Sequence, residues 1–73
     1  NKWYAQAIKA IDEQIAAKPN FQNTSRKATI LAGAGRMQEA LAAAEKAVEV
    51  GKAEKADTSA LEKRIADMKA GKQ

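Results

Sequence analysis

Two segments of this chain carry the same amphipathic pattern 33 positions apart, residues 3–17 and residues 36–50. In each segment apolar residues recur every three or four positions, the spacing of one face of an α-helix. The matched positions are Tyr4/Met37, Ala7/Ala40, Ile8/Leu41, Ile11/Ala44, Ile15/Val48 and Ala17/Val50. A repeat of this period is typical of helical arrays in which each unit buries its apolar face against the next. The sequence therefore predicts an all-α helical array, an architecture that more often binds other molecules than catalyses reactions.

Length and composition restrict the chemistry. With 73 residues the chain has room for a single domain with one core. It contains no cysteine and no histidine, which excludes disulfides, thiolate nucleophiles, imidazole bases and the common zinc ligand sets. The carboxylates occupy mostly polar positions, so no catalytic acid and base pair can be named among them. We therefore expect a protein that is not an enzyme, with no catalytic residue, no cofactor and no metal site.

The charges are spread along the chain. The 13 basic and 9 acidic side chains are interleaved and leave a formal net charge of +4. Nucleic-acid binding, which needs a basic stripe along the phosphates, is therefore not expected. No apolar run approaches the roughly 18 residues of a membrane span, and no span is expected. Charges three or four residues apart predict ion pairs on helix surfaces: Lys9 with Glu13, Lys63 with Asp67, and Glu49 with Lys52.

The first half of the chain predicts two helices. The first covers about residues 2–17, and Pro19 ends it because the residue before a proline is pushed out of the helical region. Its apolar stripe consists of Trp3, Ala7, Ile8, Ile11 and Ile15. The second helix begins between residues 22 and 24, with Asn23 or Thr24 as its cap, and runs to about Ala34. Its expected core residues are Ala28, Ile30 and Leu31, and Phe21 is expected to close the preceding turn over Ile15.

The second half predicts two more helices. Gly33 and Gly35 end the second helix, because glycine readily takes the left-handed conformation of a helix terminus. The third helix covers about residues 37–50, with an extension to residue 55 left open, and its apolar face is small: Ala40, Leu41, Ala44, Ala47 and Val48. The fourth begins at residues 57–59, where Ser59 and Glu62 have the spacing of a capping box. Leu61, Ile65 and Met68 form its apolar side.

The two central helices and their turn follow the order of a known repeat. A small residue, Ala28, precedes a turn of sequence GRMQEA at residues 35–40, and a second small residue, Ala47, follows. This order resembles the tetratricopeptide (TPR) repeat, with residues 22–51 as one full repeat. The resemblance implies TPR-like antiparallel helical hairpins over residues 1–73, with residues 1–18 as half a repeat and residues 57–70 as a capping helix.

The chain also departs from the TPR pattern. Met37 stands where an aromatic residue is usual, Thr24 where a large apolar residue is frequent, and Lys52 where a proline would come. Residues 27–69 are similar to the C-terminal helical tail of a bacterial domain-of-unknown-function family, number twenty-nine eleven, whose members are mostly exported. That resemblance implies a periplasmic or exported setting and carries no known activity.

The TPR resemblance also implies a binding face. In TPR arrays the first helix of each repeat lines a groove that holds a partner peptide. Carried over by position, the resemblance implies a partner-binding face of Gln22, Ser25, Arg26 and Thr29, with Arg26 as its one cation. Alternatively, one and a half repeats are too few to form a groove, and these residues are plain surface.

Two aromatic residues open the first helix. Trp3 and Tyr4 are candidates for an exposed apolar contact, because aromatic side chains dominate binding hot spots. The favoured alternative is that one of them packs on the second helix or on a helix further upstream. If an upstream helix is missing, the bare face of the first helix favours self-association.

These observations predict a non-catalytic protein–protein interaction module, or a helical accessory domain of a larger bacterial protein, whose partner is a protein or peptide. The chain begins directly on the apolar stripe of a helix, which suggests an excised piece of something longer. The alternative is a purely structural, engineered or excised helical scaffold with no partner of its own.

Overall fold

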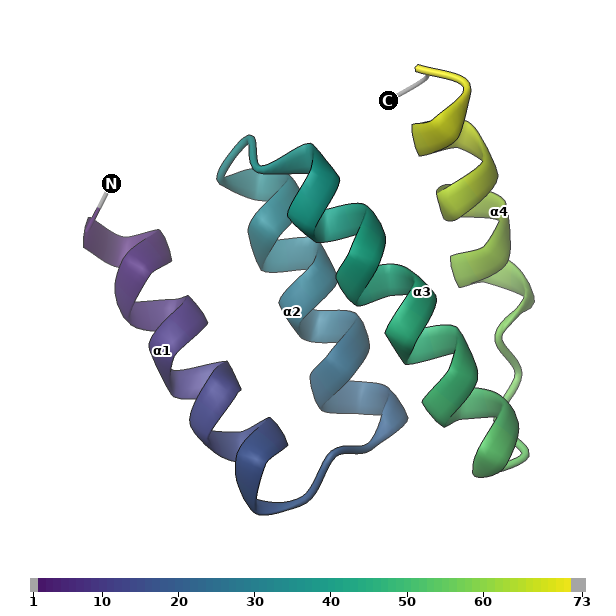
Figure 1. Ribbon diagram of the computed structural model, residues 1–73, viewed down its shortest axis with the longest axis horizontal. Coiled ribbons are helices and arrows are strands. Elements are labelled where there is room, and N and C mark those ends of the chain that lie inside the picture. Colours follow the sequence, from purple (N-terminus) through teal and green to yellow (C-terminus); the bar gives the residue numbers. More distant parts are fainter. Residues whose placement is uncertain (1, 72–73) are drawn as a thin grey trace.

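A computed structural model describes residues 2–71 of the chain, and these residues form four α-helices and no strand. The helices are α1 (Lys2–Ala17), α2 (Phe21–Gly33), α3 (Met37–Ala53) and α4 (Ser59–Lys69). Figure 1 shows them side by side in chain order, each antiparallel to the next. The predicted all-α fold of four helices is therefore confirmed, and the helices are joined by connections of three to five residues.

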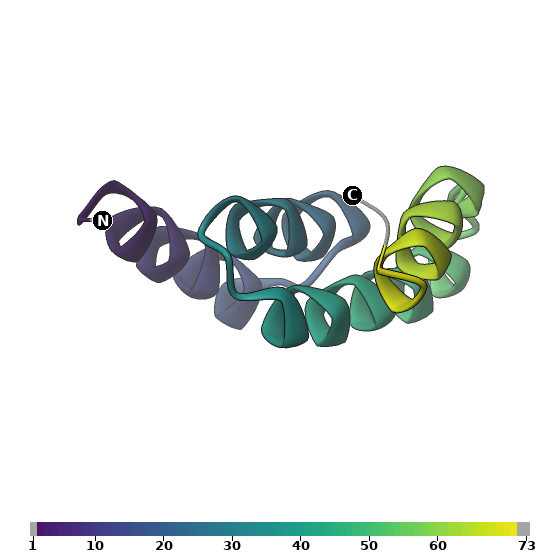
Figure 2. The ribbon, with the colours of Figure 1, turned by 90° about the horizontal axis from the view of Figure 1, so that it is seen from above.

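The helices form a single layer. The fold measures 31 × 31 × 13 Å, so it is flat, with its four helices side by side. Each helix packs against its neighbours in sequence, α1 on α2, α2 on α3 and α3 on α4. Seen along the layer in Figure 2, α2 lies toward one side and α3 toward the other. The helices are therefore staggered across the layer.

Alanine dominates the core. The buried apolar residues are Ile11 on α1, Ala28 and Leu31 on α2, and Ala40, Ala44 and Ala47 on α3. The three alanines of α3 are at most 1% exposed and recur every three or four residues, so they share one face of the helix. Small side chains on that face allow close helix packing. The predicted core is confirmed at these positions, whereas Leu41 and Val48 are half-buried.

Gly51 is the point of closest approach at the far end of α3. A Cβ atom added to Gly51 would lie 2.5 Å from Cγ2 of Thr58 and 2.7 Å from Cδ1 of Phe21. The Phe21 ring therefore packs against α3, where the sequence had predicted it over Ile15. The side chain of Glu54 adds to this contact, because its Oε2 accepts a hydrogen bond of 3.1 Å from the Phe21 N–H. Gly51 is thus a packing residue that joins the start of α2 to the loop before α4.

The cap of α2 differs from the prediction. Asn20, rather than Asn23 or Thr24, is the N-cap, and α2 begins at Phe21. The Asn20 Oδ1 accepts from the Asn23 N–H at 2.8 Å, and the Asn23 Oδ1 accepts from the Asn20 N–H at 2.9 Å. Thr24 lies inside the helix and donates its hydroxyl to the Asn20 carbonyl at 2.6 Å. The prediction was wrong because three neighbouring residues suit a cap, and only the reciprocal geometry selects one of them.

The helices α2 and α3 end in the same way. After α2, the Arg36 N–H bonds to the Leu31 carbonyl and the Gly35 N–H to the Ala32 carbonyl, which is the Schellman pattern. Gly35 has the positive φ of 81° that this pattern requires, as expected for a helix-ending glycine. The corresponding residue after α3 is Lys55, with φ of 61°. A lysine therefore occupies a backbone conformation that suits glycine.

The predicted capping box of α4 is absent. Ser59 is the first residue of α4, and the preceding Thr58 makes no side-chain cap bond. Thr58 instead donates its hydroxyl to Glu62 Oε2 at 2.8 Å. The side-chain acceptor before α4 is Asp57. Its Oδ1 accepts one hydrogen bond from the Ser59 N–H at 3.0 Å and one from the Ser59 hydroxyl at 2.6 Å. Thr58 is buried against Gly51, and this packing favours the hydrogen bonds of Asp57 and Thr58 over the predicted capping box.

Candidate functional site

The four residues of the predicted binding face lie together on one side of α2. Gln22, Ser25, Arg26 and Thr29 line a single open depression, and all but the half-buried Ser25 are exposed. The hydroxyls of Ser25 and Thr29 donate to the carbonyls of Gln22 and Ser25, at 3.1 and 3.3 Å. Arg26 is the only charged residue of the depression. This outer face of α2 is polar and offers little apolar surface to a partner.

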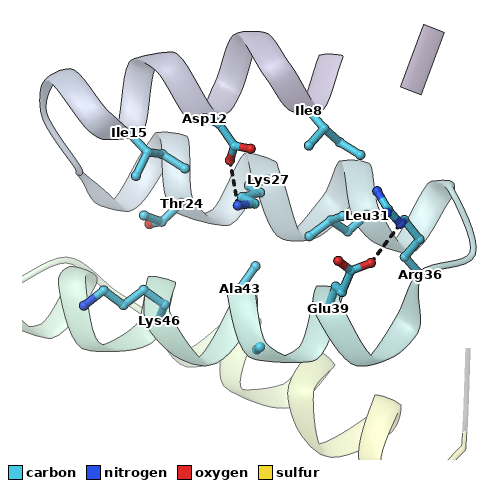
Figure 3. Close-up of a pocket in the computed structure, with 11 residues that line it drawn as sticks. Ile8, Asp12, Ile15, Thr24, Lys27, Leu31, Arg36, Glu39, Ala43 and Lys46 are labelled. Atoms are coloured by element: carbon cyan, nitrogen blue, oxygen red, sulfur yellow. Dashed lines mark ion pairs between the residues drawn. The ribbon is translucent and has the colours of Figure 1, made fainter. Parts of the chain in front are cut away.

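A larger hollow lies on the opposite side of α2. Thr24, Lys27 and Leu31 are about half a turn around the helix from the predicted face, at 100° per residue. They form the floor of a groove between α1 and α3 with a volume of about 570 Å³. We call this the α1–α3 groove. Figure 3 shows its residues converging from the three helices.

The walls of the α1–α3 groove are largely apolar. Ile8 and Ile15 of α1 are half-buried on one side, and Ala42 and Ala43 of α3 stand on the other. Leu31 of the floor is 3% exposed, so it closes the base of the groove. The groove exists because α1 and α3 both pack against α2 from either side. It therefore presents apolar surface to solvent within a small layered fold.

Charged side chains cross the groove and border it. Lys27 Nζ lies 2.6 Å from Asp12 Oδ1, which joins α2 to α1 in the middle of the groove. Arg36 Nε lies 2.8 Å from Glu39 Oε2 at one end. Lys46, at the other end, is in none of the ion pairs of the described residues. The lining therefore has three cations and two carboxylates, a net charge of +1.

Two of the ion pairs use carboxylates that are one repeat of 33 residues apart. Asp12 pairs with the next helix through Lys27, and Glu45, which is 33 residues later, pairs with the next helix through Lys69 at 3.2 Å. The two carboxylates thus occupy matched positions of the repeat, whereas their partners Lys27 and Lys69 are 42 residues apart. A fourth pair, Lys52 with Glu62 at 3.6 Å, joins α3 to α4.

The local ion pairs predicted from the sequence were wrong. In the described part of the chain, neither Lys9 with Glu13 nor Lys63 with Asp67 forms an ion pair. Glu49 does not pair with Lys52, whose ammonium points to Glu62 instead. For Lys52, a carboxylate on the neighbouring helix α4 competes with Glu49, and spacing along one helix does not reveal it.

The two aromatic residues of α1 take different roles. Tyr4 is half-buried, and its ring lies against Gly33 of α2, where an added Cβ would come within 3.2 Å of it. Trp3 is 61% exposed and meets the Tyr4 ring edge to face, with centroids 4.9 Å apart. The expectation that one of the pair packs on the second helix is correct for Tyr4. Trp3 does not belong to the core, although its position on the apolar stripe predicted that.

The titratable groups form no reactive cluster. Among residues 2–71, no three acidic side chains come together as they would around a metal ion. Ser59 donates two hydrogen bonds to the Asp57 carboxylate, and they lower the pKa of Asp57 below the ordinary value of 3.8. The bond from the hydroxyl has the larger effect, and the bond from the N–H has the smaller one. Asp57 is fully exposed and lies in the loop before α4, far along the chain from the groove residues.

Among residues 2–71, no helix has the length and apolar character of a membrane span.

Comparison with known proteins adds no identification, because no protein-family model, no curated protein and no solved structure matches this chain. The structure establishes the all-α fold, and the TPR and bacterial-family resemblances remain predictions.

The α1–α3 groove was missed by the sequence prediction, which assigned Ile8 and Ile15 to the core. One signal was present. Asp12 falls between them at helical spacing, so a carboxylate stands beside the apolar stripe. A charge at that place indicates that this side of the stripe reaches solvent.

Proposed function

We propose that this chain is a non-catalytic, TPR-like module that binds a segment of another protein. The observation that carries the proposal is that α2 borders a hollow on each of two opposite sides, the open depression of Gln22, Ser25, Arg26 and Thr29 and the α1–α3 groove. A helix in this position offers an outer face and the floor of the α1–α3 groove at the same time. The groove supports binding further, because it combines apolar walls with a few charged groups, as protein-binding and ligand-binding clefts do.

The second candidate is a structural scaffold without a partner. It is favoured by the pairing of most charged groups in the groove within the chain itself, Asp12 with Lys27 and Arg36 with Glu39. Ion pairs of this exposure contribute about 0–1 kcal/mol each, so they would not prevent a partner from rearranging them. We therefore place the interaction module first.

A peptide-display selection on the immobilised chain tests the proposal. Two variants block one surface each, Arg26→Glu on the outer face and Ala42→Phe in the groove, and both change exposed residues. Selection of peptides with a shared sequence pattern, and loss of their binding to one of the two variants, would support the module. Circular dichroism melts must show that both variants fold.

The opposite result would support the scaffold. The scaffold predicts a selection that yields no peptides with a shared sequence pattern. Selected peptides that bind both variants as well as the parent chain would instead place binding on another surface of the chain. Sedimentation equilibrium on the chain alone then checks whether it self-associates through α1, the further alternative raised by Trp3 and Tyr4.

A further inference from the structure

We propose that the α1–α3 groove binds one amphipathic helix of a partner protein, with a carboxylate of that helix placed at Lys46. The inference rests on the proposed function as an interaction module and adds to it the surface, the form of the partner and its charge.

The groove has the shape for the apolar face of a helix. Ile8 and Ile15 are seven residues apart on α1 and so stand two turns, about 10 Å, along one wall. The opposite wall consists of Ala42 and Ala43, whose small side chains allow a helix backbone to approach. Leu31 supplies an apolar base between the walls. Anchors at i, i+4 and i+7 of a docked helix would lie along this surface, the usual pattern of helix-in-groove recognition.

An extended peptide fits this site less well. Strand addition requires an open sheet edge with unpaired N–H and C=O groups. The described residues contain no strand, and the walls and floor of the groove come from helices whose backbone bonds are internal. Recognition in the groove must therefore come from side chains, which a helix presents on one face at this spacing.

The charges select an acidic partner. Asp12 and Glu39 already neutralise Lys27 and Arg36, at 2.6 and 2.8 Å. Lys46 lines the groove, is exposed and has no ion pair among the described residues. The chain as a whole has a formal charge of +4, which attracts an acidic segment and opposes a second copy of itself. An acidic helix is therefore the occupant that the electrostatics favour.

Two designed peptides test the inference. Each is a fluorescein-labelled, alanine-rich helix of about four turns with leucines at i, i+4 and i+7. One carries glutamates beside the leucines, and the other carries lysines at the same positions. Fluorescence anisotropy gives their affinities, and amide chemical shifts of the isotope-labelled chain locate the contact.

We expect the glutamate peptide to bind more tightly than the lysine peptide and to shift the amides of Ile8, Ile15 and Ala43. Lys46→Glu should weaken the glutamate peptide by about two- to fivefold, the range for an exposed ion pair, and strengthen the lysine peptide. The matched control is Lys63→Glu, an equal charge change at an exposed site of α4 outside the groove, and it should alter neither affinity by as much.

A second pair of variants tests the shape. Ala42→Phe fills the groove and should abolish binding, whereas Ala53→Phe makes the same change at an exposed site of α3 outside it and should leave binding intact. Melting curves confirm that the variants fold.

Three outcomes would overturn the inference. If the shifted amides belong to Gln22, Arg26 and Thr29, the α1–α3 groove is not the binding site, while the proposed function as an interaction module stands. If neither peptide binds but display selection yields other ligands, the acidic helix is the wrong occupant. If the groove amides shift with chain concentration and no peptide, the occupant is a second copy. Failure of the proposed function itself would differ from all three, because display selection would then yield no ligand.

Discussion

At the scale of single residues, Lys55 occupies a backbone conformation that costs stability. Its φ of 61° lies in the left-handed region. There the side chain comes too close to the following carbonyl, which costs roughly 1–2 kcal/mol. Lys55→Gly relieves this crowding but makes the unfolded chain more flexible, which offsets part of the gain. We expect the free energy of unfolding to rise by about 0.5–1 kcal/mol in urea titrations followed by circular dichroism.

The matched control for this substitution is Lys63→Gly in the interior of α4. There the same replacement should lower the free energy of unfolding by about 1 kcal/mol, because glycine is a poor helix former. Equal effects of the two substitutions would show that the left-handed conformation of Lys55 carries no cost.

Asp57 gives the chain a pH-dependent contact. Folding lowers its pKa below 3.8 because Ser59 donates two hydrogen bonds to the carboxylate. The contribution to stability is therefore present above the unfolded pKa and is lost as the pH falls through the lower, folded pKa. An NMR titration of the Asp57 carboxyl should give a midpoint below 3.8 that moves up in Ser59→Ala, because the hydroxyl bond is the larger cause. An unchanged midpoint in Ser59→Ala would contradict this assignment.

Residue-scale predictions from the sequence succeeded where one chemical preference dominates. Gly35 at the end of α2 was predicted because its positive φ strongly favours glycine. The cap of α2 was not, since Asn20, Asn23 and Thr24 are all good caps and their hydrogen bonds decide among them. Trp3 and Tyr4 likewise cannot be distinguished by hydropathy. Only the contact with Gly33 shows that Tyr4 packs against α2.

At the scale of elements, Gly51 fixes how three segments meet. An added Cβ would lie 2.5 Å from Thr58 Cγ2 and 2.7 Å from Phe21 Cδ1, closer than packed atoms approach. Gly51→Ala would gain about 1 kcal/mol in helix propensity. We expect the crowding to outweigh that gain and lower the free energy of unfolding by about 1–3 kcal/mol in chemical denaturation.

Gly33→Ala is the matched control, because Gly33 is also helical and contacts an aromatic ring. Its added Cβ would meet the Tyr4 ring at 3.2 Å, and that ring lies near the start of α1, where it can shift. The change in stability should be under about 1 kcal/mol. A Gly51→Ala variant as stable as Gly33→Ala would mean that the contact with Phe21 and Thr58 relaxes freely.

Helix limits were largely predictable because proline and glycine act locally. Pro19 ends α1 after Ala17, and Gly35 ends α2, as the sequence indicated. The cap of α4 was one of the exceptions, although its start at Ser59 lies within the predicted residues 57–59. Burial of Thr58 against Gly51, a contact between residues on different elements, replaced the expected Ser59–Glu62 box.

At the scale of the whole molecule, the single layer predicts uneven stability. The inner helices α2 and α3 each pack against two neighbours, whereas α1 packs mainly against α2 and α4 mainly against α3. In such an array local opening starts at the ends. We expect native-state amide hydrogen exchange in α1 and α4 to be about tenfold or more faster than in the centres of α2 and α3.

The control for this prediction is Ile11→Ala, which removes the one buried side chain of α1. It should accelerate exchange in α1 and leave α3 nearly unchanged, since α1 packs mainly against α2. Equal acceleration in all four helices would instead show that the layer opens as one cooperative unit.

By itself the sequence determined that the chain is helical, where α1 and α2 end and which small residues of α3 are buried. Those features follow from periodicity and from the preferences of proline, glycine and alanine, which act within a few residues. The tertiary structure alone decided that Lys27, Lys52 and Lys69 pair with carboxylates on other helices, and that Tyr4 rather than Trp3 packs on α2. It also decided that the Ile8 side of α1 borders a groove, because each of these depends on the distance between residues on different helices.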